Sequence, residues 1–286
     1  MKQAVYIGIG LLLIGLASIA CTSSPSQNEA SPDTFETFAQ WCQNRASLPS
    51  ATQHTVEAIL DVVGTQRCRR AEAKLTDSSK LDLSNRNIVD LSPLTSVAHL
   101  SSLNLSANEL VDVSPLTDLT QLSSLNLQQN QVTDLSPLTN LTQLTELSLV
   151  SNQIADISPL AGLSNLAGLS IDSNQIADVS PLSGLANLTE LSLRRNQIVD
   201  VSPLATLTQL YRLHLSDNRI VDVAPLGNLR QLEFLELESN QIVDVSPLAT
   251  LDGVLAVSLI DNPIRDRTCP VPLGNACSFE LPPRPE

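Results

Sequence analysis

Cysteine and histidine are the side chains of this chain that could support nucleophilic or metal chemistry, and their spacing argues against both. The 200 residues between Cys68 and Cys269 contain no cysteine. The three histidines are widely separated along the chain: His54, His99 and His214. Catalysis needs such groups to converge on one site, and we find neither a glycine-rich phosphate loop nor a cluster with metal-ligand spacing. The sequence therefore predicts a non-catalytic protein that needs no metal or other cofactor.

The cysteines fit structural roles better. Cys42 and Cys68 precede a region of internal repeats, and Cys269 and Cys277 follow it. If the chain is exported, it reaches an oxidising compartment in which disulfides persist. We therefore predict one disulfide within each pair, with free buried thiols as the alternative.

Residues 1–20 have the order of features of a signal peptide. Lys2 precedes an apolar run from Ala4 to Leu16, and small residues follow up to Ala20. The run is too short to span a bilayer comfortably. We expect this segment to be removed and exclude it from the fold.

The segment Ser18-Ile19-Ala20-Cys21 resembles the lipobox of bacterial lipoproteins, although Ser18 stands where that family usually has leucine. The resemblance implies that Cys21 is acylated and anchors an exported protein to a membrane of the cell envelope. Ordinary release as a secreted or periplasmic protein and an uncleaved anchor are the alternatives. Residues 21–32 are rich in serine and poor in apolar side chains, so we expect a flexible tether.

The charge balance restricts the possible partners. The chain has 30 acidic and 16 basic residues, a net charge of −14. This excess disfavours nucleic acid as a partner and also tight binding to anionic lipid. We expect a monomer whose only membrane contact is the N-terminal lipid.

A 22-residue repeat dominates the rest of the chain. Asparagine recurs at this interval at Asn108, Asn130, Asn152, Asn174, Asn196, Asn218, Asn240 and Asn262. Nine LxL-type pairs keep the same period, from Leu81/Leu83 to Val257/Leu259, and the unit reads LxxLxxLxLxxNxIxDVSPL. Alternation places both residues of each pair on the inner side of a short strand. Each unit leaves an apolar face that only the next unit can cover, which predicts an α/β solenoid.

The polar columns of the repeat have predictable roles. Asparagine carries both a donor and an acceptor, so a column of asparagines can bond backbone groups from repeat to repeat. Arg86 stands at the asparagine position of the first repeat, so we expect the ladder to begin one repeat late. Serine before each proline could cap a helical turn, and the aspartate two residues earlier could solvate or cap the same turn.

These motifs resemble the bacterial leucine-rich-repeat proteins of the internalin type, over about Leu81 to Asn262. The resemblance implies a horseshoe of about nine repeats. It also implies a protein that binds other proteins, often at a cell surface, through the concave face formed by the strands.

Both ends of such a stack need caps. Within residues 33–75 we predict a helical N-terminal cap. A first helix with Asp33 and Glu36 at capping-box spacing carries Phe38 and Trp41, a second helix ends at Gly64, and a third covers about Thr65 to Leu75. The repeats occupy 76–262, and residues 263–286 form a small disulfide-linked cap and a proline-rich tail.

The strand positions that face solvent change character along the stack. Early repeats carry serine and asparagine there, whereas later ones carry charged and aromatic side chains: Glu190, Arg194, Arg212, His214, Phe234, Glu236 and Glu238. Arginine and aromatic residues are enriched among energetic anchors of interfaces. We therefore predict that this patch binds a protein or peptide. The alternatives are solvated surface ion pairs, a glycan or cell-wall binder, and a passive structural protein.

Overall fold

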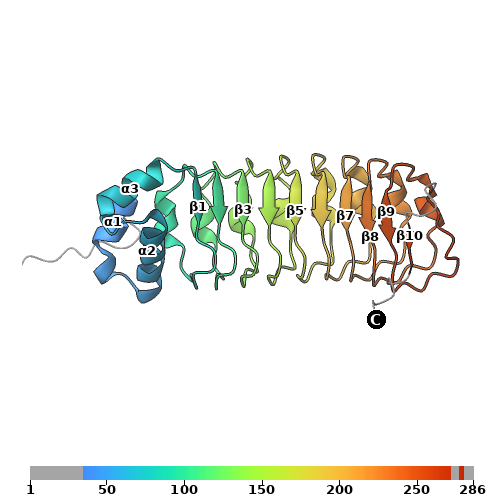
Figure 1. Cartoon of the computed structure of the whole chain (residues 1–286), viewed down its shortest axis with the longest axis horizontal. Helices are drawn as coiled ribbons and strands as arrows, with labels where there is room; N and C mark the ends of the chain where they lie inside the picture. The colour runs from blue at the N-terminus through green and yellow to red at the C-terminus, as the bar shows by residue number, and fades with distance from the viewer. Residues whose placement is uncertain (1–34, 272–276, 280–286) are drawn as a thin grey trace, which may run out of the picture.

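The computed structural model describes residues 35–271 and 277–279. The predictions for the signal peptide, Cys21, the tether, Asp33 and the proline-rich tail lie outside these residues. Within them, the predicted solenoid with a cap at each end is confirmed. Figure 1 shows it as one elongated stack, with helices at the N-terminal end.

Three α-helices and one 3₁₀ turn form the N-terminal cap: α1 (Phe38–Gln43), η2 (Arg45–Ser47), α2 (Ser50–Val63) and α3 (Cys68–Thr76). A capping box starts α1, in which the Thr37 side chain accepts from the backbone N–H of Gln40 and the Gln40 side chain accepts from the N–H of Thr37. The helix thus begins later than the predicted spacing of Asp33 and Glu36, because Thr37 and Gln40 are the pair that satisfies its free N–H groups.

The second helix ends as predicted, at Gly64, whose φ of 66° is the left-handed conformation that glycine adopts without strain. Its buried face includes Val56, Ile59 and Leu60. The third helix starts at Cys68, later than the predicted Thr65, and a disulfide joins Cys68 to Cys42 across a Cα–Cα distance of 5.5 Å. This bond fixes α3 against α1.

One parallel sheet of ten strands runs the length of the stack, in sequence order. Its strands are β1 (Lys80–Asp82), β2 (Ser102–Asn104), β3 (Ser124–Asn126), β4 (Glu146–Ser148), β5 (Gly168–Ser170), β6 (Glu190–Ser192), β7 (Arg212–His214), β8 (Phe234–Glu236), β9 (Ala256–Ser258) and β10 (Cys277–Ser278). The register pairs Leu81 with Leu103 and every later leucine with its equivalent one repeat on. Strand β10, which the sequence did not predict, extends the sheet beyond the last repeat, and the Cys269–Cys277 disulfide ties it down.

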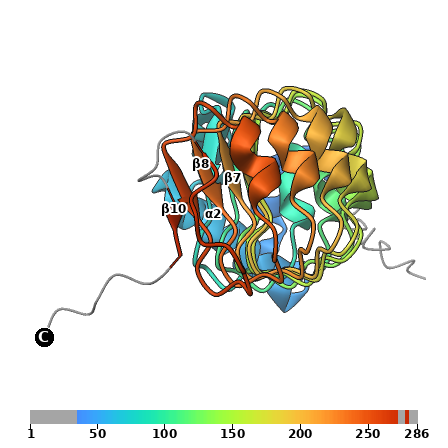
Figure 2. The same ribbon diagram turned by 90° about the vertical axis from the view of Figure 1, so that its right-hand side faces the viewer.

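After each of the strands β1 to β8, the chain returns through a 3₁₀ turn. These turns are η3 (Ser92–Ser96), η4 (Ser114–Leu116), η5 (Ser136–Leu138), η6 (Ser158–Leu160), η7 (Ser180–Gly184), η8 (Ser202–Thr206), η9 (Ala224–Asn228) and η10 (Ser246–Thr250). Figure 2 shows the later ones stacked on the side of the solenoid away from the strands. The leucine, isoleucine and valine columns fill the space between the two sides.

Aspartate, and not serine, caps these turns. In η6 the carboxylate of Asp156 accepts from both the backbone N–H and the hydroxyl of Ser158, at 2.8 and 3.0 Å. Serine is already the first residue of the turn, so its own N–H needs a partner. The prediction that serine caps the turn is therefore wrong, and the capping role suggested for the aspartate column is the one observed.

The asparagine column forms a continuous internal ladder. Asn152 accepts from the backbone N–H of Val132 at 3.0 Å and donates to the carbonyls of Leu127 and Leu149, both at 3.0 Å. Each ladder asparagine therefore makes hydrogen bonds both within its own repeat and to the preceding repeat. Asn108 accepts from the N–H groups of Arg86 and Ile88, so it completes the first repeat, which lacks its own asparagine.

Candidate binding surface on the strands

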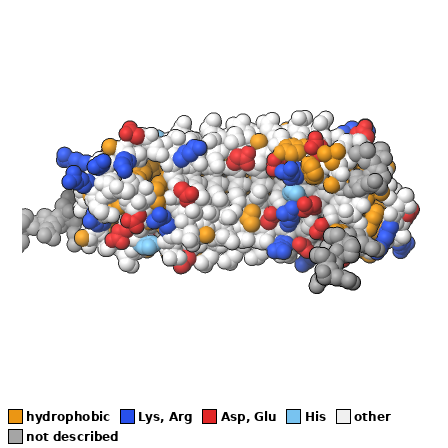
Figure 3. Space-filling model, viewed as in Figure 1, with side chains coloured by type: hydrophobic (Ala, Val, Ile, Leu, Met, Phe, Trp, Pro, Cys, Tyr) orange, Lys and Arg blue, Asp and Glu red, His pale blue; other side chains and the backbone are white. Residues whose placement is uncertain are grey.

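The face of the strands is polar and uniform over β2 and β3, then becomes charged and aromatic. Figure 3 shows basic, acidic and hydrophobic side chains gathered toward the C-terminal half of this face. All seven predicted patch residues lie in or directly after β6, β7 and β8. The sheet brings six of them together in two groups, and the seventh, Glu238, bonds with Ser258.

The first group is an ionic network of Arg194, His214 and Glu236. Arg194 crosses the intervening repeat, and its Nε and Nη2 donate to Glu236 Oε2 at 2.9 and 2.5 Å. His214 lies between them in β7, with Nδ1 3.0 Å from both Arg194 Nη2 and Glu236 Oε2. A neutral imidazole can therefore accept from the guanidinium or donate to the carboxylate, according to its tautomer.

Burial sets the charge of His214. Its side chain is only 16% exposed, and this desolvation lowers the pKa of His214 below its ordinary value of 6.5. The Glu236 carboxylate opposes the shift, while the Arg194 guanidinium adds to it. The neutral ring is thus the form that the fold favours near neutral pH.

The second group places a guanidinium against two aromatic rings. The Cζ atom of Arg212 lies 5.5 Å from the ring centre of Tyr211 and 5.2 Å from that of Phe234, within the range of cation–π attraction. Arg212 also forms an ion pair with Glu190, whose Oε2 lies 3.5 Å from Arg212 Nη1. The Tyr211 hydroxyl donates to Glu190, and this hydrogen bond raises the pKa of Tyr211.

Leu255 extends the apolar part of this group, and the sequence analysis missed it. Its side chain is 55% exposed, and its N–H donates to the carbonyl of Glu233, which places it beside β8. The signal was present, since serine, threonine or alanine stands at this position from residue 79 to residue 189. Tyr211, Phe234 and Leu255 together form what we call the anchor cluster.

Asp172 is a second missed residue. Its Oδ1 accepts from the Ser192 hydroxyl at 2.5 Å and from the backbone N–H of Arg194 at 2.8 Å. Glu238, at the far side of the network, accepts from the Ser258 hydroxyl at 2.6 Å. Two adjoining hollows of about 230 and 560 Å³ open on this surface, and Asp172 and Arg194 line both.

The other predicted chemistry-bearing groups do not join this surface. His54 Nε2 lies 2.6 Å from the carbonyl of Arg86 in the N-terminal cap, and His99 Nε2 lies 2.8 Å from the carbonyl of Leu75. In residues 35–271 and 277–279, no three His, Cys, Asp or Glu side chains form a group that could hold a metal ion. Nor does that part of the chain contain a helix long and apolar enough to cross a membrane.

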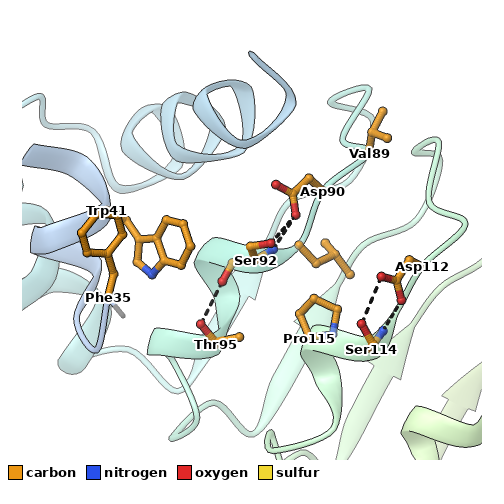
Figure 4. Close-up of a pocket in the computed structure, with 10 residues that line it drawn as sticks. Phe35, Trp41, Val89, Asp90, Ser92, Thr95, Asp112, Ser114 and Pro115 are labelled. Carbon is orange, nitrogen blue, oxygen red and sulfur yellow. Dashed lines mark hydrogen bonds between the residues drawn. The ribbon is translucent and has the colours of Figure 1, made fainter. Parts of the chain in front are cut away.

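A separate cleft of about 660 Å³ lies where the N-terminal cap meets the first two repeats. Figure 4 shows Trp41 and Phe35 on one side and the Asp–Ser turns on the other. Asp90 and Asp112 are already bonded to Ser92 and Ser114, as in the other turns of this type. The aspartate and serine side chains of these turns thus satisfy one another.

Comparisons with known proteins agree with this architecture. A family model described as leucine-rich repeats in two copies matches residues 120–162, 164–206 and 208–250. No curated protein matches the chain in sequence.

Among solved structures, internalin C2 of Listeria monocytogenes is 38% identical, with a TM-score of 0.67, over 71% of this chain and 91% of that one. A second internalin of the same organism, inlF, is 31% identical, with a TM-score of 0.63, over 78% of this chain and 75% of that one. The ectodomain of the Arabidopsis thaliana receptor kinase GASSHO1/SCHENGEN3, solved with Casparian strip integrity factor 2, is 24% identical. It shares the fold, with a TM-score of 0.61, over 71% of this chain and 26% of its own. The two internalin matches, together with the repeat and its caps, show that this chain belongs to the leucine-rich-repeat proteins of the bacterial internalin type.

Proposed function

We propose that this protein binds a protein or peptide partner through the strand face of β6 to β9 and does not act on it as an enzyme. The observation that carries the proposal is the anchor cluster: the Tyr211 and Phe234 rings lie against the Arg212 guanidinium, and the exposed Leu255 lies beside β8. Tyr211 and Phe234 are half-buried and Leu255 is exposed, and aromatic and apolar side chains beside arginine are what protein interfaces bury at their centres. The plant receptor ectodomain, whose structure contains a second polypeptide factor, supports a polypeptide as the kind of partner.

The surface also suits such a role mechanically. Arg194, His214 and Glu236 hold one another in place across three repeats. Side chains that are already ordered lose less conformational freedom when a partner binds. The sheet beneath keeps its register from β1 to β9, so the anchors stand on a rigid support.

A double variant tests the proposal. Phe234→Ser with Leu255→Ser removes two anchors, and we expect it to weaken binding of a partner isolated from extracellular or envelope extract by about 100-fold. Val111→Ser with Val199→Ser is the matched control, because both valines are 55% exposed but lie outside the strands. Equal affinity of the two double variants would refute the proposed surface. Saturable binding to a glycan array with no polypeptide partner would favour the glycan-binding alternative.

We further propose that the protein works outside the cytoplasm and that a lipid on Cys21 anchors it to a membrane. The support is the lipobox-like segment ending at Cys21 and the similarity to internalins. Mass spectrometry of the mature N-terminus tests it: a diacylglyceryl group on Cys21 is the expected result. An unmodified mature N-terminus would refute the anchor and leave a released protein.

A further inference from the structure

Ser216 carries a buried hydroxyl with no hydrogen-bond partner in the described part of the chain. The residue is 4% exposed and lines the larger hollow of the strand face, about 560 Å³ in volume. Burying a hydroxyl without a partner is unfavourable. A ligand that enters this hollow and bonds the hydroxyl would remove that cost.

The hollow has more acidic than basic groups. Four carboxylates line it, from Asp172, Asp217, Glu236 and Glu238, against the guanidinium groups of Arg194 and Arg195. Arg194 pairs with Glu236 at 2.5 Å, and Arg195 lies 3.6 Å from Asp217. Asp172 and Glu238 are instead held by hydroxyl and backbone N–H donors. The negative charge of these two carboxylates is therefore available to a cation.

Ser216 and Glu238 stand at the same position of neighbouring repeats. Each directly follows the second leucine of its LxL pair, Leu215 or Leu237. Equivalent positions on adjacent strands lie roughly 4.8 Å apart, so one nitrogen between the two side chains can reach both. Glu238 accepts one hydrogen bond from Ser258, and a carboxylate can accept several more.

We propose that this hollow binds a lysine or arginine side chain of the protein partner. The cationic nitrogen donates to the Ser216 hydroxyl and to the Glu238 carboxylate, and Asp172 adds to the attraction from the other end of the hollow. The proposal rests on the proposed function, because it adds the chemistry of the partner to the same surface. It predicts a basic recognition segment, which also suits a chain with a net charge of −14.

The test uses hexalysine and hexaarginine peptides as probes, titrated into the ¹⁵N-labelled protein and followed by amide chemical shifts. We expect saturable shifts at Ser216, Asp217 and Glu238. Glu238→Gln should weaken hexalysine binding about tenfold, and Ser216→Ala about threefold. Hexaglutamate should produce no saturable shifts at these residues.

Two controls separate a site from general electrostatic attraction. Glu109→Gln removes the same charge from an exposed position of an early repeat, and Ser106→Ala removes a hydroxyl that is 7% exposed at the position equivalent to Ser216. Both should leave hexalysine affinity within about twofold of the unmodified protein. An equal loss in Glu238→Gln and Glu109→Gln would overturn the proposal, and so would shifts spread evenly over the surface.

The outcome is separable from that of the proposed function. The Phe234→Ser and Leu255→Ser double variant keeps Ser216 and Glu238, so it should still bind hexalysine with the affinity of the unmodified protein. If hexalysine fails to bind, the polypeptide partner can still depend on the anchor cluster. If the anchor variant binds its partner normally while Glu238→Gln alters hexalysine binding, the hollow stands and the anchor surface is wrong.

Discussion

Removing one asparagine from the middle of the ladder should have a cost that can be worked out from its bonds. Asn196 accepts from the N–H of Ile176 at 3.0 Å and donates to the carbonyls of Ile171 and Leu193 at 3.0 and 3.1 Å. The residue is 8% exposed, so water has little access to these groups. Its amide also donates to the carbonyl of Arg194 at 3.2 Å, and that carbonyl accepts from the N–H of Ser173 as well. Asn196→Ala deletes all four contacts at once.

The four contacts are not equally important. The carbonyl of Ile171 also accepts from Asn174, and that of Leu193 also accepts from Asn218, so each keeps one bond in the variant. The N–H of Ile176 loses its partner and is left unsatisfied. An orphaned buried donor costs about 1–3 kcal/mol, and each lost second bond about 0.5–1.5 kcal/mol. The Asn196 amide has two hydrogens to donate, so two donor bonds are lost, and we expect Asn196→Ala to lower the free energy of unfolding by about 2 to 6 kcal/mol.

Urea unfolding followed by circular dichroism measures this loss. Asn187→Ala is the control, because Asn187 is an exposed asparagine whose single described bond goes to the carbonyl of Ser164. It should change the unfolding free energy by less than about 0.5 kcal/mol. Hydrogen exchange should also show the Ile176 amide opening faster in Asn196→Ala. A variant as stable as the control, with unchanged exchange at Ile176, would refute the ladder's role.

Two further predictions concern packing and protonation. A Cβ at Gly227 would lie 2.8 Å from the backbone oxygen of Pro247, whereas one at Gly184 would meet nothing within 4 Å. Gly227→Ala should therefore lower the free energy of unfolding by about 1–3 kcal/mol, and Gly184→Ala should leave it unchanged. Thermal unfolding of the two variants measures this difference. Burial lowers the pKa of His214 in the folded state, so the unfolded chain binds the proton more readily. The stability contributed by this residue is therefore present above pH ~6.5 and is lost as the pH falls through the lowered pKa. His214→Gln should flatten the pH dependence of unfolding in that window, and an unchanged slope would contradict the assignment.

The repeating columns of the fold could be predicted because the same local pattern recurs eight or nine times along the chain. Leucine at alternate positions and asparagine at a buried corner have few other structural solutions. The caps are less regular, so their details were harder to predict. The sequence contains more than one capping-box spacing, and only contacts in the folded cap select Thr37 with Gln40.

One backbone feature has no signal in residue type. The residue before each ladder asparagine has a φ between 52° and 58°, yet alanine, glutamine, serine, arginine and aspartate all occur there. The left-handed conformation costs such residues about 1–2 kcal/mol each. Hydrogen bonds of the asparagine ladder hold the corner closed on either side, so the constraint comes from stacking and not from the residue itself.

The proposed binding surface was predicted as a list of residues, but not as a set of contacts. Spacing places Arg194, His214 and Glu236 on one face without showing that Arg194 crosses a whole repeat to reach Glu236. That path depends on rotamers and on the burial of His214, which only the assembled sheet determines. Asp172 was missed for the same reason, since its role is to hold Ser192 and the backbone of Arg194.

Buried and solvent-facing positions alternate in each strand, so the surface residues can vary along the stack while the leucine core stays the same. Leu213 and Leu235 are buried and keep the register of β7 and β8, while the neighbouring position that is serine in β2 and β3 becomes Arg212 and Phe234. Stability in such a stack comes from the contacts between neighbouring repeats. Substituting Phe234 or Leu255 should therefore leave unfolding nearly unchanged, and a loss of binding in those variants can be attributed to the surface itself.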